Sequence, residues 1–268
     1  MNEGQRLIDE QPPPWGDDPL STFFKNAEYN DRVSALNLAS VYALLKRVHA
    51  SFGRVQAAVE KDNREHLLIP RFLVVRTHSS FLAAIRLGMS GQLSESYAIL
   101  REAIEQAWYA LHIARDPRPP DRTTVWLCRN DDQASKAKCK TEFTVRNVRS
   151  THESVDPATA KQLHDLYETM IDFGAHPNQM GLLAFLKQSE TDKEINYQVG
   201  ILCAETVALV STLRLAVAVA VGGLKVFQLI FPERFRPTSL DVEIETIVAE
   251  LNTVFRAYIP KGQSNVSG

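Results

Sequence analysis

Apolar residues recur every three or four positions over most of this chain, which is the spacing that places them on one face of an α-helix. The clearest case runs from Arg76 to His112, where two such stretches meet at Ser90-Gly91-Gln92. We therefore expect a long antiparallel helical hairpin. Its second helix has an apolar face at Leu93, Tyr97, Leu100, Ile104 and Leu111, and its first helix has one at Phe72, Val75, Ser79, Leu82, Ile85 and Met89.

The same spacing predicts helices on both sides of the hairpin. Residues 1–27, with three consecutive prolines, are expected to form an extended arm, and residues 28–61 a long helix. Further helices are expected over residues 157–171, 194–221 and 241–258, with a disordered tail at 260–268. No segment indicates paired strands or an internal repeat. The sequence thus predicts an all-α, multi-helix bundle with one helical domain over residues 28–259.

The amino-acid composition and net charge limit which kinds of protein this chain can be. The chain has 268 residues, of which 44% are hydrophobic and 23% charged, as in an ordinary globular protein. Its net charge of −2 argues against a nucleic-acid coat but leaves a local basic patch open. Cys128, Cys139 and Cys203 lack metal-ligand spacing and indicate reduced thiols in a cytoplasmic protein. The acidic, proline-rich N-terminus does not resemble a signal peptide, so we expect none.

The most apolar stretch, Val207–Leu224, is interrupted by Arg214. Its longest uninterrupted apolar run is too short to span a bilayer. We expect a buried core helix here and no membrane span.

A stripe of charged and polar residues borders the apolar face of the hairpin. Arg101 and Glu105 lie one turn apart on the second helix and can form an ion pair, and His112 follows on the same line. Packing of the hairpin would bring Arg76 and His78 of the first helix towards them. This stripe either fixes how the two helices pack, or forms a polar pocket in which Glu105 acts as acid or base and Arg101 binds an anion.

A second candidate site lies where the helix over residues 157–171 ends. Tyr167 and Asp172 come before His176, which is followed by Pro177 and Asn178. The histidine is expected either to cap the helix or to line a pocket, where its ring can transfer a proton. No second His, Cys or carboxylate stands at a metal-motif distance, so we expect no metal and no cofactor.

The segment from Arg122 to Arg149 is the most basic part of the chain. It is typical either of a solvated helix or of a surface that contacts RNA or another anion. Signature motifs of serine hydrolases, P-loop proteins, dinucleotide-binding folds and zinc proteases are missing from the sequence.

The hairpin sequence LREAIEQAWYALHIA, together with the later YETMIDFGAHPN, resembles uncharacterised bacterial proteins related to the HEPN superfamily, over roughly residues 70–180. The resemblance implies a compact helical bundle that forms a homodimer. Many HEPN-like proteins are metal-independent RNases with an Arg-x4–6-His motif, and others lack the motif. Two stretches fit this spacing, Arg71 with His78, and Arg146-Asn147 with His152.

Three functions follow from these observations. The first is a non-catalytic role in binding a small molecule or a partner protein, which the missing catalytic motifs favour. The second is a metal-independent endoribonuclease of a toxin or phage-defence system, with Arg146, Asn147 and His152 as its site. The third is a small-molecule enzyme that uses Glu105 and His176.

Overall fold

The computed structural model describes residues 14–175, 179, 186–190, 194–203 and 206–258, and these are almost entirely helical. The predicted all-α bundle is therefore confirmed. Its α-helices are α2 (Pro19–Asn37), α3 (Ala39–Glu60), α4 (Leu68–Ser90), α5 (Leu93–Ala114), α6 (Asp121–Leu127), α7 (Gln133–Glu142), α8 (Val145–Val155), α9 (Pro157–Met170), α11 (Thr206–Ile230), α12 (Pro232–Phe235) and α13 (Leu240–Arg256). Short helical turns are η1 (Glu65–Leu67), η2 (Cys128–Asn130), η3 (Ile171–Ala175) and η4 (Arg236–Thr238).

The predicted hairpin is present as α4 and α5. Gly91 ends α4 with φ 98°, a left-handed conformation that glycine adopts without strain. The backbone N–H of Gln92 donates to the carbonyl of Leu87 at 2.8 Å, which closes the turn. Helix α5 is the central helix of the bundle, with α4, α8, α9 and α11 packed around it. Leu100, Trp108 and Leu111 of α5 are completely buried.

The expected core helix is found as α11, which carries a long series of buried residues from Leu209 to Ile230. It continues without a break through Gly222-Gly223. A Cβ at position 222 would overlap the side chain of Leu163, so this glycine allows α9 to approach α11 closely. Glu65–Ser90 and Thr206–Ile230 are long and apolar enough to cross a membrane, and 44% and 67% of their most apolar windows are buried in the bundle.

Three expectations about the elements are wrong. Residues 19–27 are helical rather than extended, because the carboxylate of Asp18 accepts from the backbone N–H groups of Leu20 and Ser21 and caps α2. The helix expected over 28–61 is divided at Leu38, whose φ of −111° and ψ of 42° are not helical. The beginning of the helix expected over 194–221 is a strand.

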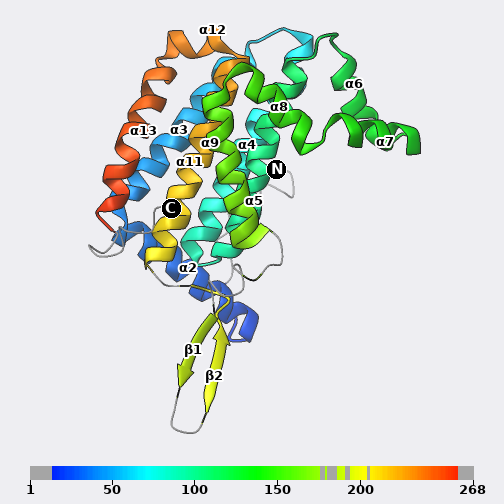
Figure 1. Cartoon of the computed structure of the whole chain (residues 1–268). Coiled ribbons are helices and arrows are strands. Elements are labelled where there is room, and N and C mark those ends of the chain that lie inside the picture. The colour runs from blue at the N-terminus through cyan, green and yellow to red at the C-terminus, as the bar shows by residue number, and fades with distance from the viewer. Residues whose placement is uncertain (1–13, 176–178, 180–185, 191–193, 204–205, 259–268) are drawn as a thin grey trace, which may run out of the picture.

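Strands β1 (Leu186–Glu190) and β2 (Ile195–Val199) form an antiparallel hairpin that protrudes from the end of the bundle near α2 (Figure 1). In β2 the apolar residues Ile195, Tyr197 and Val199 alternate with Asn196 and Gln198, which is the period of a strand. The expectation that the chain lacks paired strands is thus incorrect.

The apolar face expected on α4 packs against the core only at its C-terminal end, at Ile85 and Met89. Phe72 and Val75 are 56% and 49% exposed, whereas Leu73, Val74 and Phe81 are buried. The N-terminal arm over residues 1–13 and the tail at 260–268 lie outside the described residues.

Candidate functional site

The Arg101–Glu105 pair forms as the sequence predicts, with 3.5 Å between Nε and Oε1. Glu105 also accepts a hydrogen bond from the hydroxyl of Tyr167 on α9, at 2.9 Å. Burial and the neighbouring Glu105 carboxylate raise the pKa of Tyr167. This contact joins α5 to α9, and it brings together two residues that the sequence had placed in separate candidate sites.

The other members of the predicted stripe lie elsewhere. Arg76 forms an exposed ion pair with Glu102, with 3.4 Å between Nη2 and Oε1. His78 accepts at Nδ1 from the amide of Gln56 (2.9 Å), and its Nε2 faces Nδ1 of His49 on α3 (2.8 Å). Burial, with the neighbouring His49, lowers the pKa of His78 to about 4. The contacts of Arg76 and His78 are thus made with residues other than Arg101 and Glu105.

The proposed RNase motif lies on α8, but its residues differ in exposure. Arg146 is exposed, and the side-chain amide of Asn147 donates to the backbone carbonyls of Thr141 and Glu142. His152 is completely buried and accepts at Nδ1 from the indole N–H of Trp108, at 3.2 Å. Burial lowers the pKa of His152 to about 4, so its ring is neutral near pH 7. A neutral, buried imidazole is poorly placed to contact an RNA phosphate.

The structure describes only part of the segment that follows α9. Asp172 lies in η3 and is exposed. His176 and Asn178 lie outside the described residues, so the structure does not place the candidate pocket at this corner.

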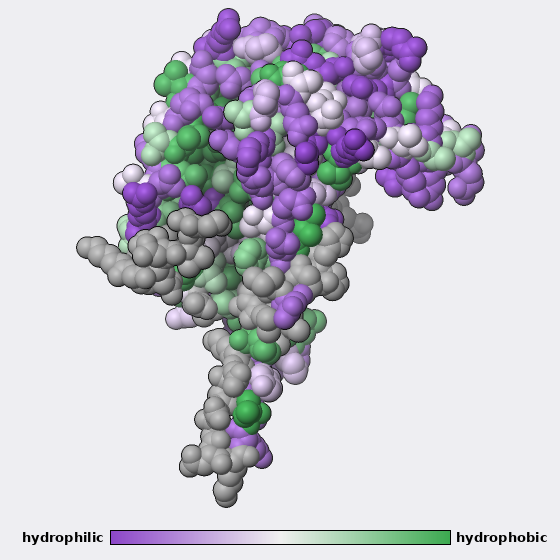
Figure 2. Space-filling view, in the orientation of Figure 1, coloured by the Kyte–Doolittle hydropathy of each residue, from purple (hydrophilic) through white to green (hydrophobic). Residues whose placement is uncertain are grey.

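A cavity lies at the opposite end of α5, where α6 and α7 project from the side of the bundle (Figure 1). Its volume is about 640 Å³, which is within the range of small-molecule sites. The projecting part of the chain has a mainly hydrophilic surface (Figure 2). The charged lining residues are Asp116, Arg118, Asp121, Arg122, Asp131, Lys138 and Glu142.

Ion pairing leaves three of these charges, Asp116, Asp131 and Lys138, without an ionic partner in the described part of the chain. Arg118 pairs with Asp121 at 3.2 Å and Arg122 pairs with Glu142 at 2.8 Å. Among the described residues, no ion pair involves Lys138 or Asp131. The Asp116 carboxylate already accepts from the backbone N–H groups of Arg118 (2.9 Å) and Arg122 (2.6 Å), so Lys138 and Asp131 are the ammonium group and the carboxylate that the cavity offers to a ligand.

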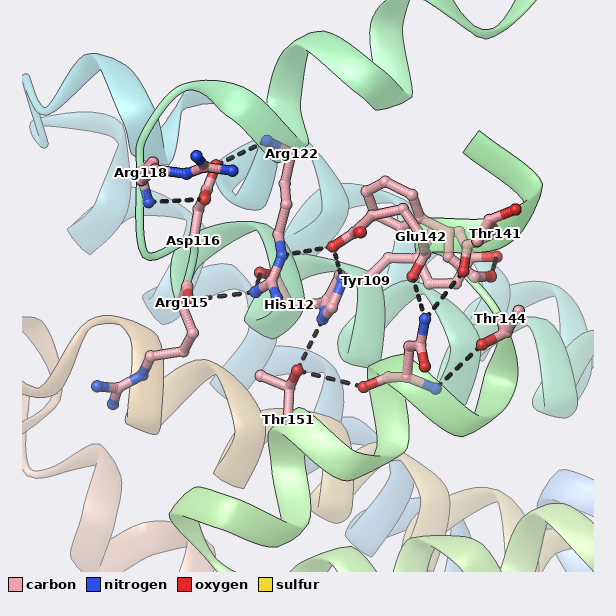
Figure 3. Close-up of polar contacts among 12 residues, drawn as sticks. Tyr109, His112, Arg115, Asp116, Arg118, Arg122, Thr141, Glu142, Thr144 and Thr151 are labelled. Atoms are coloured by element: carbon pink, nitrogen blue, oxygen red, sulfur yellow. Dashed lines mark hydrogen bonds and ion pairs between the residues drawn. The ribbon is translucent and has the colours of Figure 1, made fainter. Parts of the chain in front are cut away.

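A hydrogen-bonded network lies behind the cavity and contributes Arg122 and Glu142 to its wall (Figure 3). The carboxylate of Glu142 on α7 accepts from the guanidinium of Arg122 (2.8 Å) and from Nε2–H of His112 (3.1 Å). In the neutral imidazole, Nδ1 of His112 then accepts from the hydroxyl of Thr151 on α8, at 2.7 Å. Arg122 also donates to the backbone carbonyl of His112, at 2.8 Å. The network thus ties α5, α6, α7 and α8 together and fixes the shape of the cavity.

Electrostatics keep these groups in one protonation state near pH 7. Burial alone would raise the pKa of Glu142, but hydrogen bonds from Arg122 and His112 outweigh it and hold the pKa below its usual value. Burial and the nearby Arg122 lower the pKa of His112. A hydrogen bond to Asp131 raises the pKa of the Cys128 thiol at the cavity wall. Glu142 is therefore ionised, His112 neutral and Cys128 protonated.

Of the residues in this network, the sequence identified only His112 as a candidate site residue. Arg122, Lys138 and Glu142 belong to the segment that was recognised as basic but assigned no site. The sequence feature that could have located this site is the proline-rich Asp116-Pro-Arg-Pro-Pro120, which ends α5 and turns the chain back over that helix. No group of three or more His, Cys, Asp or Glu side chains that could bind a metal ion occurs in the described part of the chain.

Comparisons with protein-family models, with curated proteins and with solved structures find no match to this chain. The function must therefore be argued from the site itself.

Proposed function

We propose that this chain is a non-catalytic binding protein, and that the cavity between α6 and α7 binds a small molecule carrying both an ammonium and a carboxylate group. The observation that carries the proposal is that two lining side chains of opposite charge, Lys138 and Asp131, form no ion pair among the described residues. Lys138 would bind the carboxylate of the ligand, and Asp131 would bind its ammonium group. Four lining carboxylates outnumber three lining cations, which disfavours a polyanion such as RNA at this place.

The chemistry of the cavity supports binding rather than catalysis. Both ring nitrogens of His112 are occupied by Thr151 and Glu142, so the ring has no free position for a proton of the ligand. The thiol of Cys128 has a raised pKa, and a protonated thiol is a weak nucleophile. The Cys128 thiol does lie beside a carboxylate, Asp131, but a carboxylate is a much weaker base than a thiolate, so it does not supply the activated nucleophile that covalent catalysis needs.

We further propose that the bundle is HEPN-like and that the protein is cytoplasmic. The long α4–α5 hairpin supports the first statement, and the free thiols of Cys128, Cys139 and Cys203 support the second. The alternative function is a metal-independent endoribonuclease that uses Arg146, Asn147 and His152. The spacing of these residues favours it, and the burial of His152 weighs against it.

Calorimetric titration tests the binding proposal. Purified protein would be titrated with a panel of free amino acids, and then with the matching amines and carboxylates that lack one of the two charged groups. We expect at least one amino acid to bind, and both truncated forms to bind at least 10-fold more weakly. Lys138→Ala and Asp131→Asn should weaken binding by a similar factor, because each removes one ionic contact.

Lys136→Ala is the matched control, because Lys136 is an exposed residue of the same helix that does not line the cavity. It should bind like the wild type. Equal losses in Lys136→Ala and Lys138→Ala, or binding of the amine alone at full affinity, would contradict the proposed recognition.

A further inference from the structure

A second, smaller cavity lies between α2 and the turn that joins α4 to α5, at the end of the bundle away from α6 and α7 (Figure 1). Its volume is about 220 Å³. This is below the roughly 300 Å³ at which sites for drug-sized ligands begin, so the cavity fits a small head group. We call it the α2 cavity. Its aromatic and charged lining residues are Trp15, Phe23, Phe24, Glu28, Asp31 and Arg86.

Two side chains of α2 hold this helix against the end of α4. The side-chain amide of Asn30 donates to the backbone carbonyl of Ser90 at 2.9 Å. The hydroxyl of Ser34 donates to the backbone carbonyl of Met89 at 3.0 Å. Both carbonyls lie in the last turn of α4, where an α-helix leaves such groups without partners of its own. The wall that α2 contributes to the cavity is therefore fixed in place.

Three aromatic rings line one side of the α2 cavity. The rings of Trp15 and Phe24 stack with 4.8 Å between centroids, and Phe23 meets Phe24 edge-on at 5.6 Å. The indole N–H of Trp15 donates to the carboxylate of Glu28 at 3.4 Å, which ties this ring to α2. The faces of aromatic rings are electron-rich and attract a cation, most strongly where water is excluded. This side of the cavity thus suits a cation with an apolar surface.

A buried carboxylate lies on the other side. The Asp31 side chain is only 12% exposed, and its Oδ2 lies 2.7 Å from Nε of Arg86, a residue whose side chain is 70% exposed. The second oxygen, Oδ1, is buried and accepts no hydrogen bond from any described residue. Burial raises the pKa of Asp31 even though Arg86 is nearby, so the ion pair compensates the buried charge only in part. A buried acceptor without a donor costs free energy, which a ligand N–H would recover.

We propose that the α2 cavity binds an alkylated ammonium cation that keeps at least one N–H, such as a dimethylammonium group. Its N–H donates to Oδ1 of Asp31, and its methyl groups contact the rings of Trp15, Phe23 and Phe24. Two carboxylates and one guanidinium line the cavity, which favours a cation over an anion.

The other classes of ligand each leave one side of the cavity unsatisfied. A trimethylammonium group contacts the rings but has no hydrogen to donate to Oδ1 of Asp31. An unmethylated ammonium group donates, but it has little apolar surface to offer the rings. A neutral alkyl group covers the rings and shields Asp31 from water without supplying either a donor or a charge. The combination of rings and an unpartnered oxygen therefore selects the partly methylated cation.

Calorimetric titration of the full chain with four small probes tests this selection. The probes are N,N-dimethylethanolamine, choline, ethanolamine and 3,3-dimethylbutan-1-ol, which is the neutral carbon analogue of choline. We expect N,N-dimethylethanolamine to bind, and the other three to bind weaker by about 10-fold or more, because each lacks one of the two contacts. Binding of choline or of the neutral alcohol as tight as that of N,N-dimethylethanolamine would overturn the proposal.

Substitutions in α2 test the two contacts separately. Phe24→Leu keeps an apolar side chain but removes a ring, and Asp31→Asn removes the charge. Each should weaken binding of N,N-dimethylethanolamine by about 5-fold or more. Tyr29→Leu is the matched control, because Tyr29 is an exposed aromatic residue of the same helix that does not line the cavity. Phe24 is itself partly exposed, so this variant carries the test even if Asp31→Asn fails to fold. Equal losses in Phe24→Leu and Tyr29→Leu would contradict the proposed site.

Two further arms identify the source of the cation and separate this site from the cavity between α6 and α7. A peptide that contains dimethyl-lysine would be titrated beside its unmethylated form. Tighter binding of the methylated peptide than of N,N-dimethylethanolamine would indicate a methylated protein, and equal affinity a free amine. Lys138→Ala should bind N,N-dimethylethanolamine like the wild type, because Lys138 lines only the other cavity. Loss of binding in Lys138→Ala, or no binding of either dimethylated probe to the wild type, would overturn the assignment.

Discussion

The burial of His152 makes a quantitative prediction about how stability depends on pH. Its pKa is about 4 in the folded chain, against 6.5 for an unperturbed histidine. Between these values the unfolded chain binds a proton at this site that the folded chain does not. The free energy of unfolding therefore rises with pH in this window. The contribution is fully present above pH 6.5 and is lost as pH falls towards 4.

The difference between the two pKa values corresponds to on the order of 3 kcal/mol. The full difference applies because the His152 side chain is completely buried. Substitution by glutamine, whose amide oxygen can still accept from the indole N–H of Trp108, removes the titrating group. We expect the wild type to lose on the order of 3 kcal/mol more than His152→Gln between pH 7 and pH 4.

Urea unfolding followed by tryptophan fluorescence, repeated at half-unit pH intervals, measures this difference. His66→Gln serves as the control, because His66 is only half-buried in η1. The stability difference between wild type and His152→Gln should shrink as pH falls. A difference that stays constant from pH 7 to pH 4 would show that His152 titrates normally, and the argument against its accessibility to RNA would fail with it.

Three further substitutions test the packing of the bundle by urea unfolding. Gly222→Ala should destabilise the fold by about 1–3 kcal/mol, because its Cβ would overlap Leu163, and an unchanged midpoint would contradict the close approach of α9 and α11. Gly91→Ala should lower the free energy of unfolding by about 1–2 kcal/mol, because Gly91 has φ 98°, which alanine adopts only with strain. A smaller loss would mean that the backbone of the turn changes conformation to accommodate alanine. Asp62→Asn should lower the free energy of unfolding by about 1–3 kcal/mol, because Asp62 is 1% exposed and accepts a hydrogen bond from Arg64. Asn63→Asp, at the neighbouring position, is the control.

The sequence predicts local features of this fold better than contacts between distant segments. The α4–α5 hairpin could be predicted because its turn contains a glycine at the required position and its second helix has a single apolar face. Strand β2 was missed because the alternation of Ile195, Tyr197 and Val199 is short and is followed by a strongly helical stretch. For α4, apolar residues surround much of the helix, so periodicity alone could not tell which face packs in the core.

The sequence predicts individual residues of the candidate site but not the contacts that bring them together. His112 and Glu142 are 30 residues apart, and their contact depends on α7 folding back over the end of α5. No spacing rule within one helix encodes such a contact, since it is made by the tertiary packing of several elements. In contrast, Arg101 and Glu105 lie one turn apart on α5, and their ion pair follows from helix geometry alone.

The location of ligand binding tests the central claim most directly. Backbone amide resonances of isotopically labelled protein would be followed by NMR during titration with the tightest-binding amino acid. We predict that the largest shifts occur at Thr124 of α6 and Ser135 of α7, which line the cavity, and that the amide of Arg146 on α8 is unaffected. Shifts centred on α9 and η3 instead, or the absence of saturable shifts for every amino acid tested, would contradict the account.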